Sequence, residues 1–400
     1  MQFVKGRGVS APQGFQVGAA RAGIKTQGLD LALLVADEGA TCAGVFTTNQ
    51  VKAAPVLVSA EHLAQGSPRA IVVNAGNANC CTGEAGLRNA RGMCALAAAR
   101  LGLEASEVLV CSTGIIGHAL PMDKIEAALS SIEFGASDED AARAFMTTDL
   151  VPKYVAACAK INGHMVTVGG QAKGVGMIGP NMAPLVPHAT MLAFLTTDAL
   201  VERGRLQSLL ERAVAKTFNS VTVDGDMSTN DTAILFASGA SGVEITDANE
   251  MLFFQLLLAV CMDLAKKIAR DGEGATRLIQ IVVAGAATER DAQTIALSVA
   301  NSPLVKTAIF GRDPNWGRIA MAAGKAGVPF DAAKLSFSLG EVELFRQGEP
   351  VAFDKGKADR ELECDTVDIR LHFGQGEANW VAWTCDFSYD YVKINAEYHT

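Results

Sequence analysis

The sequence predicts a layered α/β fold, because runs typical of strands alternate with patterns typical of helices along most of the 400 residues. Several strand-like runs are apolar at every position, as in strands that are covered on both faces. Apolar residues make up 49% of the chain and charged residues 19%, a balance typical of globular proteins. A chain of this length can form two or three average domains or one large layered unit.

The predicted strands fall into two groups. Continuous β-rich runs predict strands at 31–36, 55–59, 70–74, 165–170, 190–196, 233–237 and 278–285. Later runs alternate between apolar and polar residues, which predicts half-exposed strands at 335–339, 367–373 and 380–384.

Helical periodicity predicts the covering layers. The expected helices are 84–101, 121–132, 137–147, 198–217, 246–270 and 289–301. Ser137 is a plausible N-cap, with Asp140 three residues later. The longest apolar stretch, 251–262, is too short to span a bilayer and predicts a buried helix, so we expect no membrane contact.

Charge and cysteine content exclude several function classes. The net charge of −9 and the scattered basic residues argue against nucleic-acid binding. An acidic balance is compatible with a cationic small-molecule substrate, although most acidic proteins are simply soluble. The first residues lack the apolar segment of a secretory signal. Nine irregularly spaced cysteines predict reduced thiols in the cytoplasm rather than disulfides. Without a CxxC pair or paired histidines, we expect no metal site.

The stretch "KGVGMIGPNMAPLVPHATMLAF", residues 173–194, carries a pattern that invites a nucleotide-binding interpretation. It satisfies GxGxxG after a predicted strand, and Asp198 lies about twenty residues further on, where dinucleotide folds place an acidic residue. A dinucleotide fingerprint must also open a helix. Three prolines follow the glycines and would interrupt that helix, so this is the minority interpretation.

Thr190 offers a second interpretation of the same stretch. A threonine hydroxyl becomes a useful nucleophile when the residue is N-terminal, because its own α-amine then serves as base. Cleavage of the Ala189–Thr190 bond by attack of that hydroxyl would create such a terminus, and strained glycine- and proline-rich backbone would favour it. The simpler alternative is a threonine that begins a buried strand. The residues alone leave both open.

Longer motifs extend over nearly the whole chain in a fixed order. Besides 173–194, they are "GVFTTNQVKAAPV", "NAGNANCCTG", "CSTGIIGHALPMDKI", "MTTDLVPK", "VDGDMSTNDT", "GRDPNWGRIAMAAGKAG" and "YVKINAEYHT". Together they resemble the ornithine acetyltransferase family, also called the bifunctional glutamate N-acetyltransferase/amino-acid acetyltransferase family.

The resemblance implies an enzyme that transfers an acetyl group from N2-acetylornithine to glutamate in the cyclic pathway of arginine biosynthesis. It implies self-cleavage into chains 1–189 and 190–400, which stay together, usually as α2β2. The implied fold is an α/β sandwich resembling N-terminal-nucleophile enzymes. No cofactor is implied, and the sequence leaves open whether acetyl-CoA is a second acetyl donor.

The resemblance also implies roles for individual residues. Thr190 matches the nucleophile, and Thr113 and Gly114 match an oxyanion hole made of a hydroxyl and a backbone N–H. The substrate contacts that it implies are Thr147, Lys173, Glu273, Asn395 and Thr400. Thr147 is preferred to its neighbour Thr148 because of its spacing from Lys173. Asn315 and Trp316 are expected to open a helix, either near the site or in a structural role.

One segment departs from the family pattern. The family usually runs "PNMATML" without interruption, whereas here the six residues "PLVPHA" (184–189) stand between Ala183 and Thr190. We expect the insertion to bulge outward, with Ala189–Thr190 cleaved as usual. The alternative is slow or absent cleavage and an inactive protein. His188 is expected to be a bystander.

Two other functions compete with acetyl transfer. A self-cleaving hydrolase, an amidase or aminopeptidase, would use water in place of glutamate as the acceptor. An uncleaved protein that only binds an acylated amino acid would need no nucleophile.

Overall fold

The computed structural model describes residues 1–182 and 191–397. The chain divides into two compact units. The first comprises the described residues up to Asn219 together with Asp226–Leu264, and the second comprises Ser220–Gly225 and the described residues from Ala265 onward. Residues on both sides of the predicted cleavage point therefore share one unit. The predicted division into chains 1–189 and 190–400 has its boundary outside the described residues and stays a prediction.

A six-stranded mixed sheet forms the centre of the first unit. Its strand order is β1 (Gln2–Phe3), β7 (Lys153–Ile161), β8 (His164–Lys173), β9 (Leu192–Thr197), β10 (Thr232–Ala237) and β4 (Thr41–Phe46). β8 pairs antiparallel with β9, and β9 pairs parallel with β10. Every residue of β9 and β10 is buried, as expected for apolar strands covered on both faces.

A four-stranded sheet packs against this first sheet. Its order is β2 (Phe15–Ala20), β3 (Leu31–Ala36), β5 (Ala70–Asn77) and β6 (Val108–Ile115), with β5 and β6 parallel. The apolar core between the sheets takes Leu34 and Ile71 from one side and Phe194 and Phe236 from the other. This core fixes the mutual placement of β6 and β8, which carry site residues.

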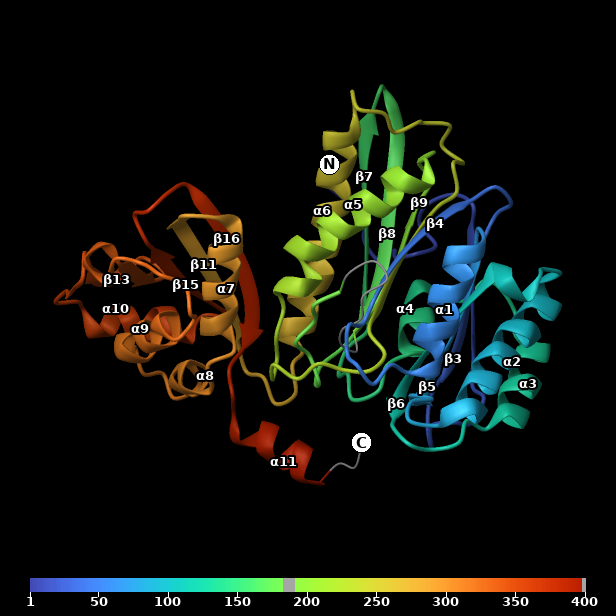
Figure 1. Cartoon of the computed structure of the whole chain (residues 1–400), viewed down its shortest axis with the longest axis horizontal. Coiled ribbons are helices and arrows are strands. Elements are labelled where there is room, and N and C mark those ends of the chain that lie inside the picture. The colour runs from blue at the N-terminus through green and yellow to red at the C-terminus, as the bar shows by residue number, and fades with distance from the viewer. Residues whose placement is uncertain (183–190, 398–400) are drawn as a thin grey trace. The chain divides into compact units, whose positions relative to one another are not determined.

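Helices cover the outer faces of both sheets, which gives the first unit four layers (Figure 1). The helices are α1 (Ala54–Gln65), α2 (Gly83–Leu101), α3 (Met122–Ser131), α4 (Asp138–Arg143), α5 (Arg203–Lys216) and α6 (Glu250–Arg270). α1, α2 and α3 pack on the four-stranded sheet, and α5 and α6 lie along the six-stranded sheet. Close contact with α6 requires Gly170 on β8, since a Cβ there would lie 2.9 Å from the Leu264 side chain.

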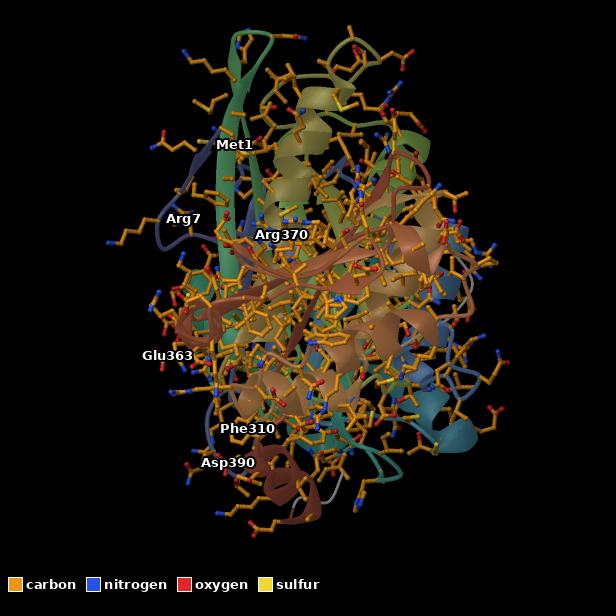
Figure 2. All side chains as sticks on the ribbon, turned by 90° about the vertical axis from the view of Figure 1, so that its left-hand side faces the viewer. Met1, Arg7, Phe310, Glu363, Arg370 and Asp390 are labelled. Atoms are coloured by element: carbon orange, nitrogen blue, oxygen red, sulfur yellow. The ribbon has the colours of Figure 1, made fainter. Side chains whose placement is uncertain are left out.

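The second unit contains its own six-stranded sheet. The order is β14 (Glu349–Pro350), β13 (Val342–Arg346), β12 (Ser336–Leu339), β15 (Thr366–His372), β11 (Leu278–Ala286) and β16 (Ala378–Cys385). The accompanying helices are α7 (Glu289–Ala300), α8 (Pro303–Phe310), α9 (Trp316–Gly324), α10 (Lys355–Glu363) and α11 (Tyr389–Glu397). Along β15, exposed Arg370 (labelled in Figure 2) alternates with buried Ile369 and Leu371.

The layered α/β class is confirmed, and most predicted elements are present close to their expected limits. The run at 55–59 is an exception: it was predicted to be a strand and lies instead in the helix α1. A five-residue apolar run cannot be told from a buried helix segment by periodicity alone. Pro55 in the first helical turn was the overlooked signal, because proline is favoured there.

Three predicted helices begin or end at other residues than expected. α5 starts at Arg203 rather than at 198, because the side chain of Glu202 accepts hydrogen bonds from the backbone of Gly204 and Arg205. α6 starts at Glu250 rather than 246. α4 ends at Arg143, four residues before the predicted end. Its predicted N-cap is confirmed, since the Ser137 hydroxyl accepts a hydrogen bond from the Asp140 N–H at 3.0 Å.

The predicted buried helix at 251–262 is confirmed as part of α6. Within the described part of the chain, no helix combines the length and apolar character that crossing a bilayer requires. All nine cysteines lie in the described ranges, and all are free thiols.

Candidate active site

Thr113 and Gly114 lie near the end of β6, where the sheet is irregular. Two β6 residues, Thr113 and Ile115, face the single residue Asn77 of β5. Such bulges redirect backbone groups and are frequent beside active sites. Gly114 has a φ of +130°, and a Cβ there would lie 2.3 Å from the Gly76 carbonyl carbon, so only glycine fits. The backbone thus permits the predicted pairing of a hydroxyl with an adjacent N–H.

Lys173, the last residue of β8, connects two of the other predicted site residues. Its Nζ donates hydrogen bonds to the Oγ1 atoms of Thr113 at 3.2 Å and of Thr147 at 3.0 Å. Lys173 is 4% exposed and Thr113 is 2% exposed. The structure therefore brings Thr113, Thr147 and Lys173 together, although they come from β6, the segment after α4, and β8.

These contacts fix the direction of both hydroxyl groups. An ammonium group only donates hydrogen bonds, so each threonine oxygen accepts from Lys173 and its own hydrogen points elsewhere. The Thr113 hydroxyl is thereby prepared to donate to another group. Thr147, the residue that the sequence favours, makes this contact with Lys173.

Asp149 holds the backbone next to Thr147 and Lys173 in place, and it was not identified as a site residue from the sequence. Its carboxylate accepts hydrogen bonds from Lys153 Nζ at 2.7 Å, Gly174 N at 2.9 Å and Thr147 N at 3.1 Å. The side chains of Asp149 and Lys153 are both fully buried. Burial alone would raise the pKa of Asp149, but the charges of Lys153 and then Lys173 outweigh it and hold that pKa at about 2.

Two further charged groups near Lys173 were also missed. Lys25 donates a hydrogen bond from Nζ to the Met146 carbonyl at 3.0 Å, and burial lowers its pKa. Asp231, immediately before β10, is completely buried, and neither carboxyl oxygen has a hydrogen-bond partner among the described residues. Burial raises the pKa of Asp231 well above its usual range, with Lys173 partly opposing the shift.

Asp231 leads to a prediction about stability. A carboxyl whose pKa is raised by folding destabilises the fold progressively as the pH rises from its unfolded-state value, 3.8, through the folded-state value. Asp231→Asn removes that ionisation. We therefore expect the variant to be more stable at pH 7 by roughly 1–3 kcal/mol, the scale for an unsatisfied buried polar group. Thermal unfolding measures this, and the gain should vanish near pH 4. A less stable variant at pH 7 would contradict the prediction.

Glu273 and Asn395 lie in the second unit. The Asn395 side-chain amide donates a hydrogen bond to Glu273 Oε2 at 2.9 Å. Asn395 belongs to α11 and is exposed, and Glu273 is half-buried in the loop after α6. These two predicted substrate residues therefore contact each other. The remaining predicted residues, Ala189, Thr190 and Thr400, as well as His188, lie outside the described residues.

The nucleotide-binding interpretation finds no support in the local geometry. β8 ends at Lys173, and the described residues after it, 174–182, form no helix. The Asp198 carboxylate is buried and accepts hydrogen bonds from the backbone of Thr167 at 2.8 Å and Gln13 at 3.5 Å. The acidic residue that a ribose would need is therefore already used inside the fold.

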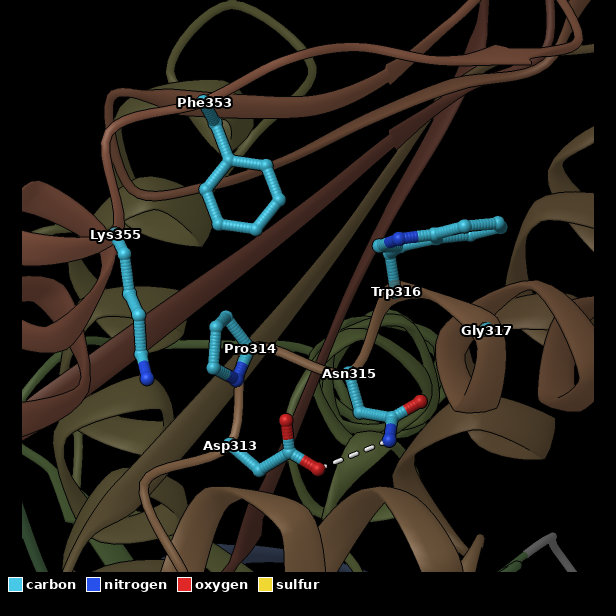
Figure 3. A pocket seen from close by; sticks show the side chains of 7 residues that line it. All are labelled: Asp313, Pro314, Asn315, Trp316, Gly317, Phe353 and Lys355. Carbon is cyan, nitrogen blue, oxygen red and sulfur yellow. Dashed lines mark hydrogen bonds between the residues drawn. The ribbon is translucent and has the colours of Figure 1, made fainter.

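Asn315 and Trp316 begin the helix α9, as predicted. The Asn315 side chain caps this helix by accepting a hydrogen bond from Arg318 N at 3.1 Å, which is a structural role. Both residues line an open pocket of about 550 Å³ in the second unit, together with Phe353 and Lys355 (Figure 3). Asn315 also donates to Asp313 in this pocket at 2.9 Å.

Within residues 1–182 and 191–397, no three His, Cys, Asp or Glu side chains gather as a metal ion would need.

Comparison with known proteins gives a consistent result over the full length. The model of the ArgJ family matches residues 16–400. The arginine biosynthesis bifunctional protein ArgJ of Gloeobacter violaceus is 49% identical, with 98% of each chain covered. The protein of the same name from Symbiobacterium thermophilum is 46% identical, with both chains covered completely.

A solved structure agrees with these relatives. The crystal structure of arginine biosynthesis bifunctional protein argJ from Bacillus halodurans matches with 43% identity and a TM-score of 0.51, covering 52% of this chain and 100% of that chain. The length of the match to the family model and the sequence identities of 46–49% are far above what chance similarity produces. The chain belongs to the ArgJ family.

Proposed function

We propose that this chain is a glutamate N-acetyltransferase of arginine biosynthesis, which moves an acetyl group from N2-acetylornithine to glutamate. The observation that carries the proposal is the contact of Lys173 with both Thr113 and Thr147, which gathers oxyanion-hole and substrate residues in one buried place. The names of the relatives support the pathway, since they are arginine biosynthesis proteins.

The first step in this proposal is self-cleavage at Ala189–Thr190. The Thr190 hydroxyl attacks the Ala189 carbonyl, the C–N bond breaks, and water hydrolyses the resulting ester, which leaves Thr190 with a free α-amine. Lys173 pairs with Leu192 across β8 and β9, so the proposed site lies beside the start of the expected second chain. The matched Bacillus halodurans chain is about half as long as this chain, as cleavage near the middle would produce.

Acetyl transfer then takes two steps. The Thr190 hydroxyl attacks the acetyl carbonyl of N2-acetylornithine while its α-amine accepts the hydroxyl proton, and that proton passes to the departing ornithine amine. The amine of glutamate next attacks the acetyl ester, and Thr190 is released with its proton restored. No step needs a metal or cofactor.

The other site residues have distinct roles in this scheme. The Thr113 hydroxyl and the Gly114 N–H donate to the negatively charged oxygen that forms in each step. The ammonium of Lys173 pairs with the substrate α-carboxylate, beside Thr147. Glu273, with Asn395, pairs with an amino group of the substrate, and Thr400 completes the contacts. We propose an α2β2 assembly of the two chains in the cytoplasm.

Thr113→Val tests the oxyanion hole. We expect kcat to fall by roughly 10²–10³, the usual effect of losing one such donor, since valine keeps the shape but cannot donate. Steady-state kinetics with N2-acetylornithine and glutamate measure this. Ser112→Ala, a change at a neighbouring buried hydroxyl whose Oγ donates to Asn74 at 2.6 Å, is the control. A kcat within about threefold of the unmodified value for Thr113→Val would contradict the role.

The choice between transfer and hydrolysis rests on the acceptor. Consumption of N2-acetylornithine should require glutamate, with N-acetylglutamate formed in equal amount. Equal rates with and without glutamate would instead indicate a hydrolase. No consumption of N2-acetylornithine under either condition would favour a protein that only binds an acylated amino acid. Replacing N2-acetylornithine with acetyl-CoA determines whether the latter is a second donor.

A further inference from the structure

The carboxylate of Asp149 holds two backbone segments in place, one next to Lys173 and the other at Thr147, which accepts a hydrogen bond from the Lys173 ammonium group. One oxygen accepts from the backbone N–H of Gly174, the residue after Lys173, at 2.9 Å. The other accepts from the backbone N–H of Thr147 at 3.1 Å. A single buried carboxylate therefore fixes the backbone on both sides of the 3.0 Å contact between Lys173 Nζ and Thr147 Oγ1.

Asp149 also interacts electrostatically with Lys173. The titratable groups that interact with Asp149 or Lys173, or with their neighbour Lys25, are Lys25 and Asp30, which precede β3, Lys153 on β7 and Asp231 before β10. Attraction between opposite charges is strong in such a buried place, because little water screens it. Asp149 is the carboxylate that interacts with Lys153, Lys173 and Lys25 at once.

We propose that Asp149 is a positioning residue for substrate recognition. It fixes the positions of Thr147 and Lys173 relative to each other and keeps Lys173 cationic, so that Lys173 can pair with the α-carboxylate of the substrate. The inference rests on the proposed function, in which Lys173 makes that ion pair. Asp149 itself touches no substrate and acts through its neighbours. Lys153 supports it by neutralising its charge at 2.7 Å.

The first test is Asp149→Asn, which removes the charge and one of the two acceptor oxygens. We expect KM to rise about tenfold or more for both glutamate and N2-acetylornithine, because both carry an α-carboxylate, while kcat changes less than about threefold. Denaturing gels should show that the variant is cleaved like the unmodified protein. An unchanged KM, or a loss confined to kcat, would overturn the inference.

The pH profile provides a readout that a purely structural role would not move. Removing the negative charge lowers the pKa of the neighbouring ammonium of Lys173. The alkaline rise in KM for glutamate should therefore begin at a pH about one unit lower in Asp149→Asn than in the unmodified enzyme. An alkaline limb at the same pH would show that Asp149 does not govern the charge of Lys173.

Asp138 offers a matched control. It is also a buried carboxylate, 4% exposed, that accepts two backbone hydrogen bonds at 2.8 Å, from Gly8 and Ser10. Asp138→Asn should lower thermal stability and leave both KM values and the pH profile unchanged. An equal rise in KM for this variant would reduce the role of Asp149 to general stability and overturn the inference.

A second variant covers the case in which Asp149→Asn does not fold, since it leaves Lys153 buried without its counter-charge. Asp149→Asn/Lys153→Gln removes both charges together. The same rise in KM supports the inference, and a KM like that of the unmodified enzyme overturns it. If the unmodified protein transfers no acetyl group, the proposed function itself is contradicted, and this outcome is distinct from a failure of the Asp149 inference.

Discussion

Replacing Thr190 with alanine is expected to yield one uncleaved chain of 41.8 kDa that transfers no acetyl group. The variant lacks the hydroxyl needed both to break the Ala189–Thr190 bond and to carry the acetyl group, and without cleavage no α-amine is available as base. Denaturing gels after prolonged incubation measure the first effect, and the acetylornithine–glutamate assay measures the second.

Thr190→Ser is the matched control, because serine retains the hydroxyl and loses only a methyl group. It should still cleave and transfer, at a lower rate. Full activity of Thr190→Ala would exclude the proposed mechanism. Full cleavage of Thr190→Ala without activity would instead assign the cleavage to another group.

The second large effect is expected for Lys153→Met. This change leaves the completely buried carboxylate of Asp149 without its closest counter-charge. Breaking a buried ion pair from one side typically costs about 3–5 kcal/mol, because the remaining charge is desolvated and uncompensated. We expect a loss of that size in the free energy of unfolding at pH 7, measured by denaturant titration. A loss below about 1 kcal/mol would contradict the importance of the pair.

The pH dependence of this effect has a definite sign. The pKa of Asp149 is about 2 in the folded chain, lowered from 3.8. The ionised carboxylate therefore stabilises the fold above pH 4, and this contribution is lost as the pH falls from about 4 to about 2. The difference between Lys153→Met and the unmodified protein should shrink across that window. Asp149→Asn/Lys153→Met should recover part of the lost stability, because the buried carboxylate that lost its partner is then removed as well.

The extent to which the fold could be predicted depends on the length and regularity of each pattern. Long periodic segments such as α2 and α7, and apolar runs such as β3 and β5, were predicted within about one to three residues. The run at 55–59 failed because five apolar residues satisfy both periodicities. The predicted helix start at 198 failed because a local side-chain cap, that of Glu202, decides that α5 begins at Arg203.

The candidate site could be predicted from the sequence only in part. Thr113, Thr147 and Lys173 were identified through motifs, but contacts across 60 and 26 residues depend on sheet register, which periodicity does not reveal. Asp149 and Lys153 lie within one of those motifs at a spacing of four, yet only the structure shows that their charges are buried together. Nothing in the sequence distinguishes Asp231 from a solvated aspartate.

The most direct test of the central claim is intact-mass analysis of the purified, unmodified protein, combined with N-terminal sequencing of each chain. The account predicts two chains whose masses sum to that of the full chain plus one water, the second beginning Thr-Met-Leu-Ala-Phe at Thr190. A single mass of 41.8 kDa after prolonged incubation, or a second chain that begins at another residue, would contradict it.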